Sequence, residues 1–380
     1  MTFDRDTKVG IVTDVYDKPQ KGGIAYYTQR LVKALKKIIP SQLCLIHTRK
    51  SADPFYKEVQ EIICPGLPII KGHYLPNPIA VSKFLKKANV GLIHIPSARP
   101  FQTPYLLLKN IKYVATIHSL ALWHKGRKFA SPNLLKWIYD EFSKAQVSFF
   151  KNKMDRYIAV SRKTKEEAMK FLKIPESKIK VIYEAPDEVF RPIKEIKLQI
   201  PDINSPYILS DEVSQKVVKI YSKLRKMGIK HKLLIFGRGE KKSDLFSLIE
   251  NLNLKKEIIF SSYIPTKELV ELYNGASLFL HLVSFEGFGL TPLEAMACGC
   301  PVIASNVGSL PEVVGEAGIL VDPNNTKEWV EKIYYILTHE DFRQELIQKG
   351  LEQAKKFSWE KAAKETIKVY EEVLNENSSS

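Results

Sequence analysis

Cysteine is scarce in this 380-residue chain, which has four, and no two of them form a Cys-x-x-Cys pair. Paired cysteines of that kind hold structural zinc, and secreted domains use disulfide frameworks. The scarcity argues against both and favours reduced thiols in a cytoplasm. The stretch Cys298–Gly299–Cys300 is better explained as the end of a helix than as a metal site.

Long apolar runs are also missing, and no stretch approaches the roughly 20 apolar residues that a membrane-spanning helix requires. The first residues, MTFDRDTKVG, lack the apolar region of a signal peptide, so we expect no leader. No Asp-x-Asp pair follows a predicted strand, as a metal site of that kind would require. No helix-turn-helix, zinc-finger or aromatic RNA-binding signature is present, which excludes a nucleic-acid-binding role.

Charge is unevenly distributed along the sequence. Residues 1–200 carry 36 Lys and Arg against 17 Asp and Glu, whereas the remainder carries 22 against 25. A basic N-terminal half indicates either an anionic partner or a solvated, Lys-rich surface. If the partner is an anionic membrane, the candidate contact segments are "LVKALKKII" (31–39) and "VSKFLKKANV" (81–90).

Short β-rich apolar runs alternate with helical patterns through the whole chain, which predicts parallel sheets covered on both faces. The first set of predicted strands covers 8–14, 43–48, 90–96, 113–119, 156–161 and 179–185. The second set covers 207–209, 232–237, 257–263, 277–283, 301–305 and 318–322.

A proline-bearing polar stretch at 191–206 separates the two sets and is typical of a linker. We therefore predict an α/β protein of two doubly wound, Rossmann-like domains that face each other across a cleft. The expected boundaries are 1–195 for an N-terminal domain and 196–357 for a C-terminal domain. Residues 358–380 should form a helix that packs back toward the first domain.

The most informative stretch is "EGFGLTPLEAMACGCPVIAS" (286–305), where a buried strand is followed by a turn and a short helix. A carboxylate at a strand's carboxyl end, such as Glu286, points into the ligand crevice of such sheets. Thr291 fits the N-cap of this helix, Pro292 its first position and Glu294 its third position. Helix capping alone would therefore explain Glu294.

Two glutamates separated by seven residues, within E-G-F-G-L-x-P-x-E-A-M-A-x-G-x-P-V-I-A-S, resemble the family-4 retaining glycosyltransferases of the GT-B fold. The resemblance continues through "GSLPEVVGEAGILVDPNN" and, upstream, through "KGGIAYYTQRL", "TIHSL" and "KLLIFGRGE". It covers nearly the whole chain, and it implies that 1–195 is the acceptor-side domain and 196–357 the nucleotide-sugar-binding domain. It implies a metal-independent hexosyltransferase that takes mannose or glucose from a GDP- or UDP-linked donor, with no further cofactor.

The resemblance also implies roles for particular residues. Glu286 faces the hydroxyls of the donor sugar, and His118 reaches that sugar from the opposite domain. The remaining donor-binding positions are Gly22 and Gly23 before the first helix, the turn residues Phe288, Gly289, Leu290 and Thr291, then Glu294 at the ribose and Ile264 at the base.

One departure from the family lies after Leu209, where a glycine loop and two basic residues usually precede the helix. Here "YILSDEVSQK" runs from strand to helix with Asp211 and Glu212 instead. We expect Arg238 to replace the missing cations, so that the donor is held by the 288–291 turn and Arg238. The alternative is a non-catalytic GT-B protein that binds a nucleotide or a partner.

The expected acceptor is a hydroxyl of a glycan or lipid-linked molecule, handled in the cytoplasm or at the inner membrane face. Two retaining mechanisms stay open. In one, the acceptor attacks from the front face with the leaving phosphate as base; in the other, a carboxylate such as Glu286 attacks covalently.

Overall fold

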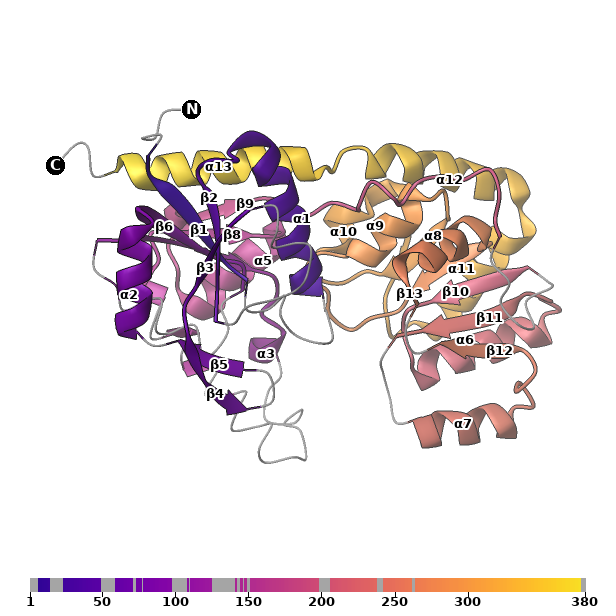
Figure 1. The fold of residues 1–380 in the computed structure, drawn as a ribbon. Coiled ribbons are helices and arrows are strands. Elements are labelled where there is room, and N and C mark those ends of the chain that lie inside the picture. Colours follow the sequence, from indigo (N-terminus) through magenta and orange to yellow (C-terminus); the bar gives the residue numbers. More distant parts are fainter. Residues whose placement is uncertain are drawn as a thin grey trace. The chain divides into compact units, whose positions relative to one another are not determined.

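The fold was analysed in a computed structural model of the chain (Figure 1). It describes residues 6–13, 23–48, 59–70, 73–76, 78–97, 108, 110–124, 141, 144–145, 147–148, 151–197, 206–237, 242–261 and 264–376. The chain forms two compact units. Unit 1 combines residues 1–184 with 359–380, and unit 2 comprises residues 185–358.

Unit 1 is built on a seven-stranded sheet of order β3-β2-β1-β6-β7-β8-β9, in which every pair of neighbours is parallel. Its strands are β1 (Lys8–Val12), β2 (Leu43–His47), β3 (Gln60–Ile63), β6 (Val90–Ile95), β7 (Lys112–Ile117), β8 (Arg156–Ala159) and β9 (Ile179–Val181). A separate antiparallel hairpin joins β4 (Gly66–Ile70) to β5 (His73–Pro76).

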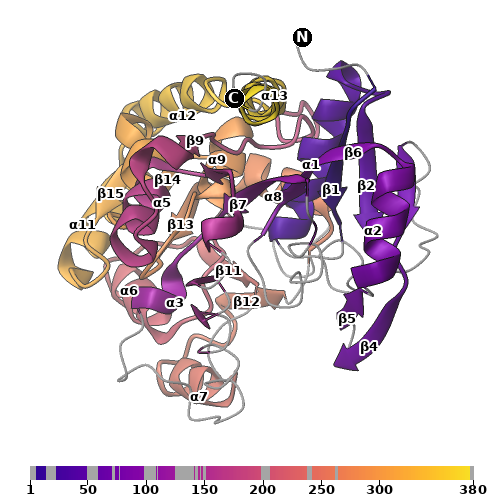
Figure 2. The ribbon, with the colours of Figure 1, turned by 90° about the vertical axis from the view of Figure 1, so that its left-hand side faces the viewer.

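Helices cover both faces of this sheet because its strands bury side chains on both sides. On one face pack α1 (Gly23–Ile38) and α13 (Trp359–Asn375). Figure 2 shows α13 end-on beside α1. The opposite face packs against α2 (Pro78–Lys87) and the π-helical turn Ala168–Leu172, which extends α5 (Arg162–Glu167). The short helix α3 (Ala121–His124) follows β7.

The C-terminal helix is fixed to unit 1 by a buried polar contact as well as by apolar packing. The Tyr370 hydroxyl lies 2.6 Å from His94 Nδ1, and His94 Nε2 lies 2.8 Å from Thr116 Oγ1. Burial lowers the pKa of His94 to about 3, so its ring is neutral and exchanges hydrogen bonds with two hydroxyls. Residues 359–375 are therefore part of the unit 1 core.

Unit 2 repeats the plan with a six-stranded parallel sheet of order β12-β11-β10-β13-β14-β15. Its strands are β10 (Tyr207–Ser210), β11 (Lys232–Phe236), β12 (Ile258–Ser261), β13 (Leu278–His281), β14 (Val302–Ser305) and β15 (Ile319–Val321). Its helices are α6 (Gln215–Lys226), α7 (Lys242–Asn251), α8 (Thr266–Gly275), α9 (Leu290–Ala297), α10 (Leu310–Val313), α11 (Thr326–Thr338) and α12 (Glu340–Ala354).

Both sheets confirm the predicted class of two doubly wound α/β units. All twelve predicted strands are present: most are a residue or two shorter than predicted at one or both ends, β9 ends four residues earlier, and β10 is one residue longer. The sequence reading missed β3 and the β4–β5 hairpin. In unit 2 the strand order reverses between β10 and β13, and ligands of such sheets bind beyond the carboxyl ends of the strands at that reversal.

Candidate functional site

The turn that follows β13 is held in place by the segment after β14. Gly289 has a φ of +105°, a left-handed conformation that favours glycine. The Ser309 hydroxyl donates to the carbonyl of Phe288 at 2.7 Å. A Cβ atom on Gly308 would lie 2.1 Å from the carbonyl oxygen of Glu286, so only glycine fits there. The 286–289 turn thus has a fixed backbone.

Glu286 lies at the carboxyl end of β13, and its side chain is 28 % exposed. Its Oε1 accepts from the amide of Gly287 at 3.0 Å and, more weakly, from that of Phe288 at 3.4 Å. Its Oε2 lies 3.3 Å from His281 Nε2. These contacts hold the carboxylate at the crevice while leaving part of it open to a ligand hydroxyl.

His281 ends β13 and is almost fully buried between two acids. Its Nδ1 lies 2.8 and 2.9 Å from the two carboxylate oxygens of Asp211, which follows the neighbouring strand β10. Burial alone would lower the pKa of His281, but the charge and hydrogen bond of Asp211, assisted by Glu286, raise it to about 10. The ring is therefore an imidazolium at neutral pH.

The start of α9 corrects the predicted capping box. The helix begins at Leu290 with Gly289 as its N-cap, and no side chain caps it. Thr291 is inside the first turn, where its hydroxyl donates to Asp211 Oδ2 at 2.6 Å. The prediction failed because a tertiary partner from β10 attracts this hydroxyl more strongly than the local backbone does.

The amide groups of Gly289 and Leu290 donate to no acceptor among the described residues. Unpaired amides at the start of a helix suit an oxygen-rich anion, which agrees with the diphosphate-binding role predicted for this turn.

Glu294 is only 6 % exposed and lies close enough to Tyr273 for its charge to act on that phenol. Burial first, and then the charges of Glu294 and Asp211, raise the pKa of Tyr273 far above its usual value, so it stays neutral.

In unit 1, both ring nitrogens of His118 face protein acceptors. Nδ1 lies 2.9 Å from Glu184 Oε1, and Nε2 lies 2.8 Å from the carbonyl of Pro96. The ring of Tyr27 meets that of His118 edge to face at 4.5 Å between centroids. In this arrangement neither nitrogen is available to a sugar, so the predicted contact requires the ring to leave one of these partners.

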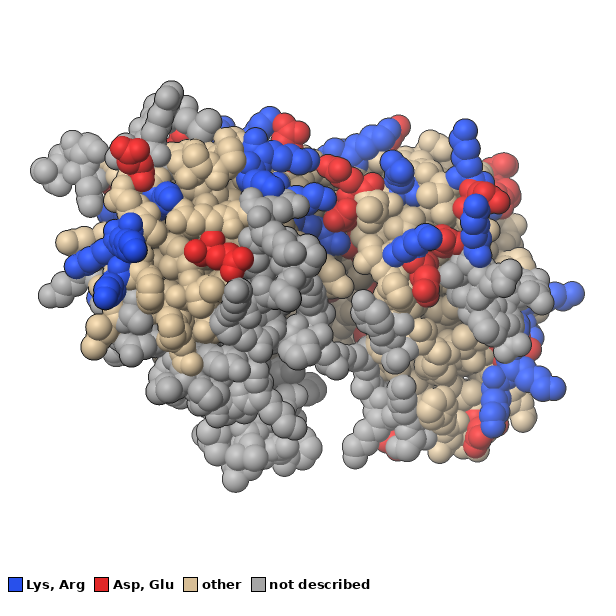
Figure 3. Space-filling view, viewed as in Figure 1, with Lys and Arg blue, Asp and Glu red and all other residues tan. Residues whose placement is uncertain are grey.

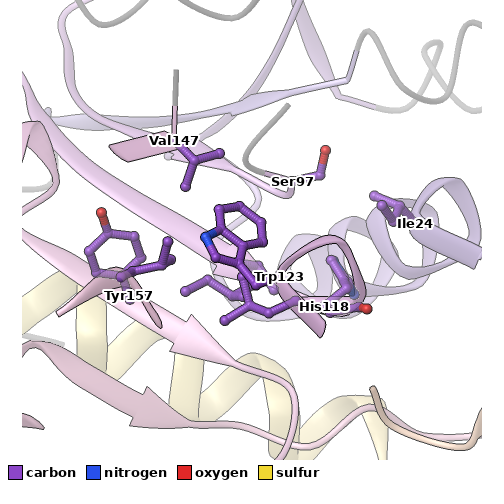
Figure 4. Close-up of a pocket in the computed structure, with 11 residues that line it drawn as sticks. Ile24, Ser97, His118, Trp123, Val147 and Tyr157 are labelled. Carbon is purple, nitrogen blue, oxygen red and sulfur yellow. The ribbon is translucent and has the colours of Figure 1, made fainter. Parts of the chain in front are cut away.

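Beside His118 lies a cavity of about 170 Å³ with a largely apolar lining. Trp123 projects across it between Val147 and His118, with Ile24 and Tyr157 on its flanks (Figure 4). Ser97 adds a buried hydroxyl that has no partner in the described part of the chain. The cavity suits a small apolar group next to a polar one.

The other predicted positions are spread over both units. Gly23 is the first residue of α1, and a Cβ there would meet nothing within 4 Å. Ile264 lies between β12 and α8 and is half-buried. Gly22 and Arg238 lie outside the described residues.

Sequence reasoning gave no role to His281 or Glu184. For His281, the available signal was a histidine near the carboxyl end of a predicted strand (277–283).

Among the described residues, no three His, Cys, Asp or Glu side chains are grouped as a metal site. No described helix combines the length and apolarity needed to cross a bilayer.

Comparison with known proteins divides the chain as the fold does. Residues 21–188 match the family "Glycosyltransferase Family 4", and residues 213–353 match "Glycosyl transferases group 1". An uncharacterised glycosyltransferase of Methanocaldococcus jannaschii is 32 % identical over 93 % of this chain and 96 % of its own. The O-antigen chain mannosyltransferase B of Escherichia coli is 41 % identical, over 37 % of this chain and 38 % of its own length.

Solved structures share the fold at low sequence identity. Sucrose-phosphate synthase from Thermosynechococcus elongatus has a TM-score of 0.75 at 21 % identity, covering 96 % of this chain and 98 % of its own. Anabaena HepE in complex with UDP-glucose has a TM-score of 0.71 at 16 % identity, covering 96 % and 99 %.

Proposed function

Because the chain belongs to the family-4 glycosyltransferases of the GT-B fold, we propose that it transfers a hexose from a nucleotide diphosphate sugar to a hydroxyl group with retention of the anomeric configuration. The observation that supports this most is the position of Glu286. Its partly exposed carboxylate lies next to His281 at the strand-order reversal of unit 2, close to the amides of Gly289 and Leu290, which donate to no acceptor among the described residues.

The donor we propose carries mannose or glucose on GDP or UDP. Similarity to the mannosyltransferase of Escherichia coli over 37 % of this chain favours mannose, and the fold shared with HepE is compatible with a UDP-sugar. Glu286 accepts hydrogen bonds from the sugar hydroxyls, the 288–291 turn and Arg238 hold the diphosphate, and Glu294 binds the ribose. No metal ion takes part in this scheme.

For the mechanism, the hydrogen bonds of Glu286 favour front-face attack over a covalent intermediate. The hydrogen bond from Gly287 and the nearby His281 imidazolium stabilise the charge on this carboxylate, which weakens it as a nucleophile. In front-face attack the acceptor oxygen bonds to the anomeric carbon as the bond to the diphosphate oxygen breaks. The acceptor's proton passes to the leaving phosphate.

The acceptor we propose is a glycan or lipid-linked molecule bound by unit 1. The apolar cavity beside His118 offers a place for its non-sugar part, with Trp123 as the principal wall. We place the reaction in the cytoplasm or at the inner membrane face.

Helix α2 supplies the best membrane-facing surface in the described part of unit 1. Ile79 is 81 % exposed and Phe84 is 40 % exposed, and three exposed lysines share the helix with them: Lys83, Lys86 and Lys87. Basic side chains gather over α2 in Figure 3. Exposed apolar groups among lysines are the pattern of a helix that lies on an anionic lipid surface.

The test of the transferase proposal combines binding with turnover. The purified chain is screened by thermal shift against UDP, GDP, ADP and their glucose and mannose derivatives. A ligand at a hundred times its dissociation constant adds about 2.7 kcal/mol to the free energy of unfolding, which is a readable shift. The stabilising donor is then incubated with glycan and lipid-linked acceptors, and the product linkage is read by NMR. An inverted product contradicts retention.

A non-catalytic GT-B protein is the second candidate, and one observation favours it. Only Asp211 to Ser214 separate the end of β10 from the start of α6, so the described loop contains two acids and no cation. The candidate predicts nucleotide binding without release of nucleotide from any sugar donor. Measurable transfer from any donor excludes it.

A further inference from the structure

One buried cation at the site has no role in the resemblance to family 4. His281 is 4 % exposed, ends β13 and lies between the carboxylates of Asp211 and Glu286. Asp211 contacts its Nδ1 at 2.8 Å, and Glu286 Oε2 stands 3.3 Å from its Nε2, an ion-pair distance without hydrogen-bond alignment. Carboxylates are acceptors only, so this surrounding fits a ring that carries protons on both nitrogens.

Asp211 links His281 to the start of α9. Its Oδ2 accepts from the Thr291 hydroxyl at 2.6 Å and also lies 2.9 Å from His281 Nδ1. Three segments are thus joined at the strand-order reversal: the end of β10, the end of β13 and the first turn of α9. Any shift of the His281 ring changes both the Glu286 carboxylate and the turn beside it.

The charges of the group matter for an anionic donor. Asp211, protonated His281 and Glu286 together carry one negative charge, and with a neutral residue at 281 they would carry two. Glu294 of α9 adds its own charge nearby, while Tyr273 of α8 stays neutral. A second uncompensated carboxylate next to the amides of Gly289 and Leu290 would repel a diphosphate.

We propose that His281 is a positioning residue for glycosyl transfer: fixed by Asp211, its imidazolium orients the Glu286 carboxylate and offsets the acids around the donor diphosphate. The inference rests on the proposed transferase function. It assigns to a histidine inside the sheet a part of the charge compensation that the resemblance expects from a basic loop after Leu209.

The pH dependence of transfer tests this role. In the wild type the imidazolium persists up to a pH of about 10, so donor use should be level between about pH 6.5 and 8.5. Asp211→Asn removes the main charge that raises the pKa of His281. Its side-chain amide can still accept a hydrogen bond from Nδ1 and form one with the Thr291 hydroxyl. Removing one such charge lowers a pKa by about 1 to 3 units. The variant's activity should therefore fall as pH rises through that shifted pKa.

Two variants separate charge from packing. His281→Gln keeps a donor toward Glu286 without the charge, and it should raise the donor's dissociation constant about tenfold or more and lower kcat. His339→Gln, at an exposed histidine between α11 and α12, is the matched control and should change neither. Wild-type donor affinity and kcat in His281→Gln, or a wild-type pH profile in Asp211→Asn, would overturn the proposal.

A measurement without turnover keeps this inference distinct from the proposed function. The eight histidines of the chain are few enough for NMR titration of their imidazole signals, with His281→Gln assigning the one of interest. We expect the wild-type His281 signal to stay in its protonated position to beyond pH 9 and to titrate lower in Asp211→Asn. Titration of the wild-type ring near its ordinary pKa defeats the inference even where transfer is observed. A chain that transfers no sugar but keeps this ring protonated defeats the proposed function, and with it the part His281 plays in transfer, but not the charge assigned to the ring.

Discussion

At the residue scale, the two glutamates of the 286–294 stretch have different surroundings, which predicts different defects. Glu286 is partly exposed at the crevice, and Glu294 is buried inside α9. Glu286→Gln should lower kcat about a hundredfold or more with little change in unfolding temperature, because the lost charge acts on the sugar and not on the core. Glu294→Gln should instead raise the donor's dissociation constant with a smaller loss of kcat. Steady-state kinetics and calorimetry of both variants test this difference. Equal losses of kcat and of donor affinity in the two variants would contradict the separate roles of the two glutamates.

Gly308 gives a second prediction at this scale. It has a φ of +56°, and an added Cβ would collide with the carbonyl of Glu286 at 2.1 Å. Gly308→Ala should cost about 2 kcal/mol or more of unfolding free energy and weaken donor binding, because the 286–289 turn must move. Gly228→Ala is the control, since φ is +90° there and nothing lies within 4 Å, so only backbone strain of about 1 kcal/mol is added. Similar costs for the two variants in denaturant titrations would mean that the collision is relieved without displacing the turn.

At the element scale, charge and apolar exposure coincide on α2, within the part of unit 1 that the structure describes. Replacing Lys83, Lys86 and Lys87 by Glu should reduce co-sedimentation with anionic vesicles about tenfold or more, because each surface lysine contributes about 1 kcal/mol on such lipid. The control reverses three exposed lysines of unit 2, Lys223, Lys226 and Lys230, for the same change in net charge. If both triple variants lose binding equally, net charge and not α2 carries the affinity. Ionic strength should weaken wild-type binding, since the attraction is screened.

At the scale of the whole molecule, the chain returns at Trp359 to complete the unit in which it began. Ile367, Val369, Tyr370 and Val373 of α13 are buried in the unit 1 core. Burial of each of these side chains contributes about 1.5–3 kcal/mol to the free energy of unfolding. Their sum is comparable to the stability of a whole domain. A chain ending at Ser358 should therefore lose hydrogen-exchange protection in β1, β6 and β7 while unit 2 keeps its own. A chain ending at Glu376 serves as the control, and protection of unit 1 without α13 would contradict this assignment.

Local sequence was sufficient for the architecture and for part of the site. Buried parallel strands consist of short apolar runs whatever they pack against, so the twelve predicted strands and the family resemblance followed from residues near one another in the chain. Strand β3 was missed because Gln60 and Glu61 obscure its apolar residues, and only pairing with β2 makes it a strand. The place of Glu286 at the end of β13 could be predicted for the same reason, since it depends on one strand and its turn.

The surroundings of that glutamate depended on contacts across the sheet. Asp211 and His281 are 70 residues apart, and they meet because β10 and β13 are adjacent at the strand-order reversal. That adjacency draws Thr291 away from the capping role that its local sequence favours, and it keeps a buried histidine protonated. In unit 1, likewise, Glu184 reaches His118 across 66 residues. The sequence alone determined which elements form and which strand ends carry polar groups. The tertiary structure decided which of those groups pair, because a charge inside a protein is set by its nearest neighbours in space.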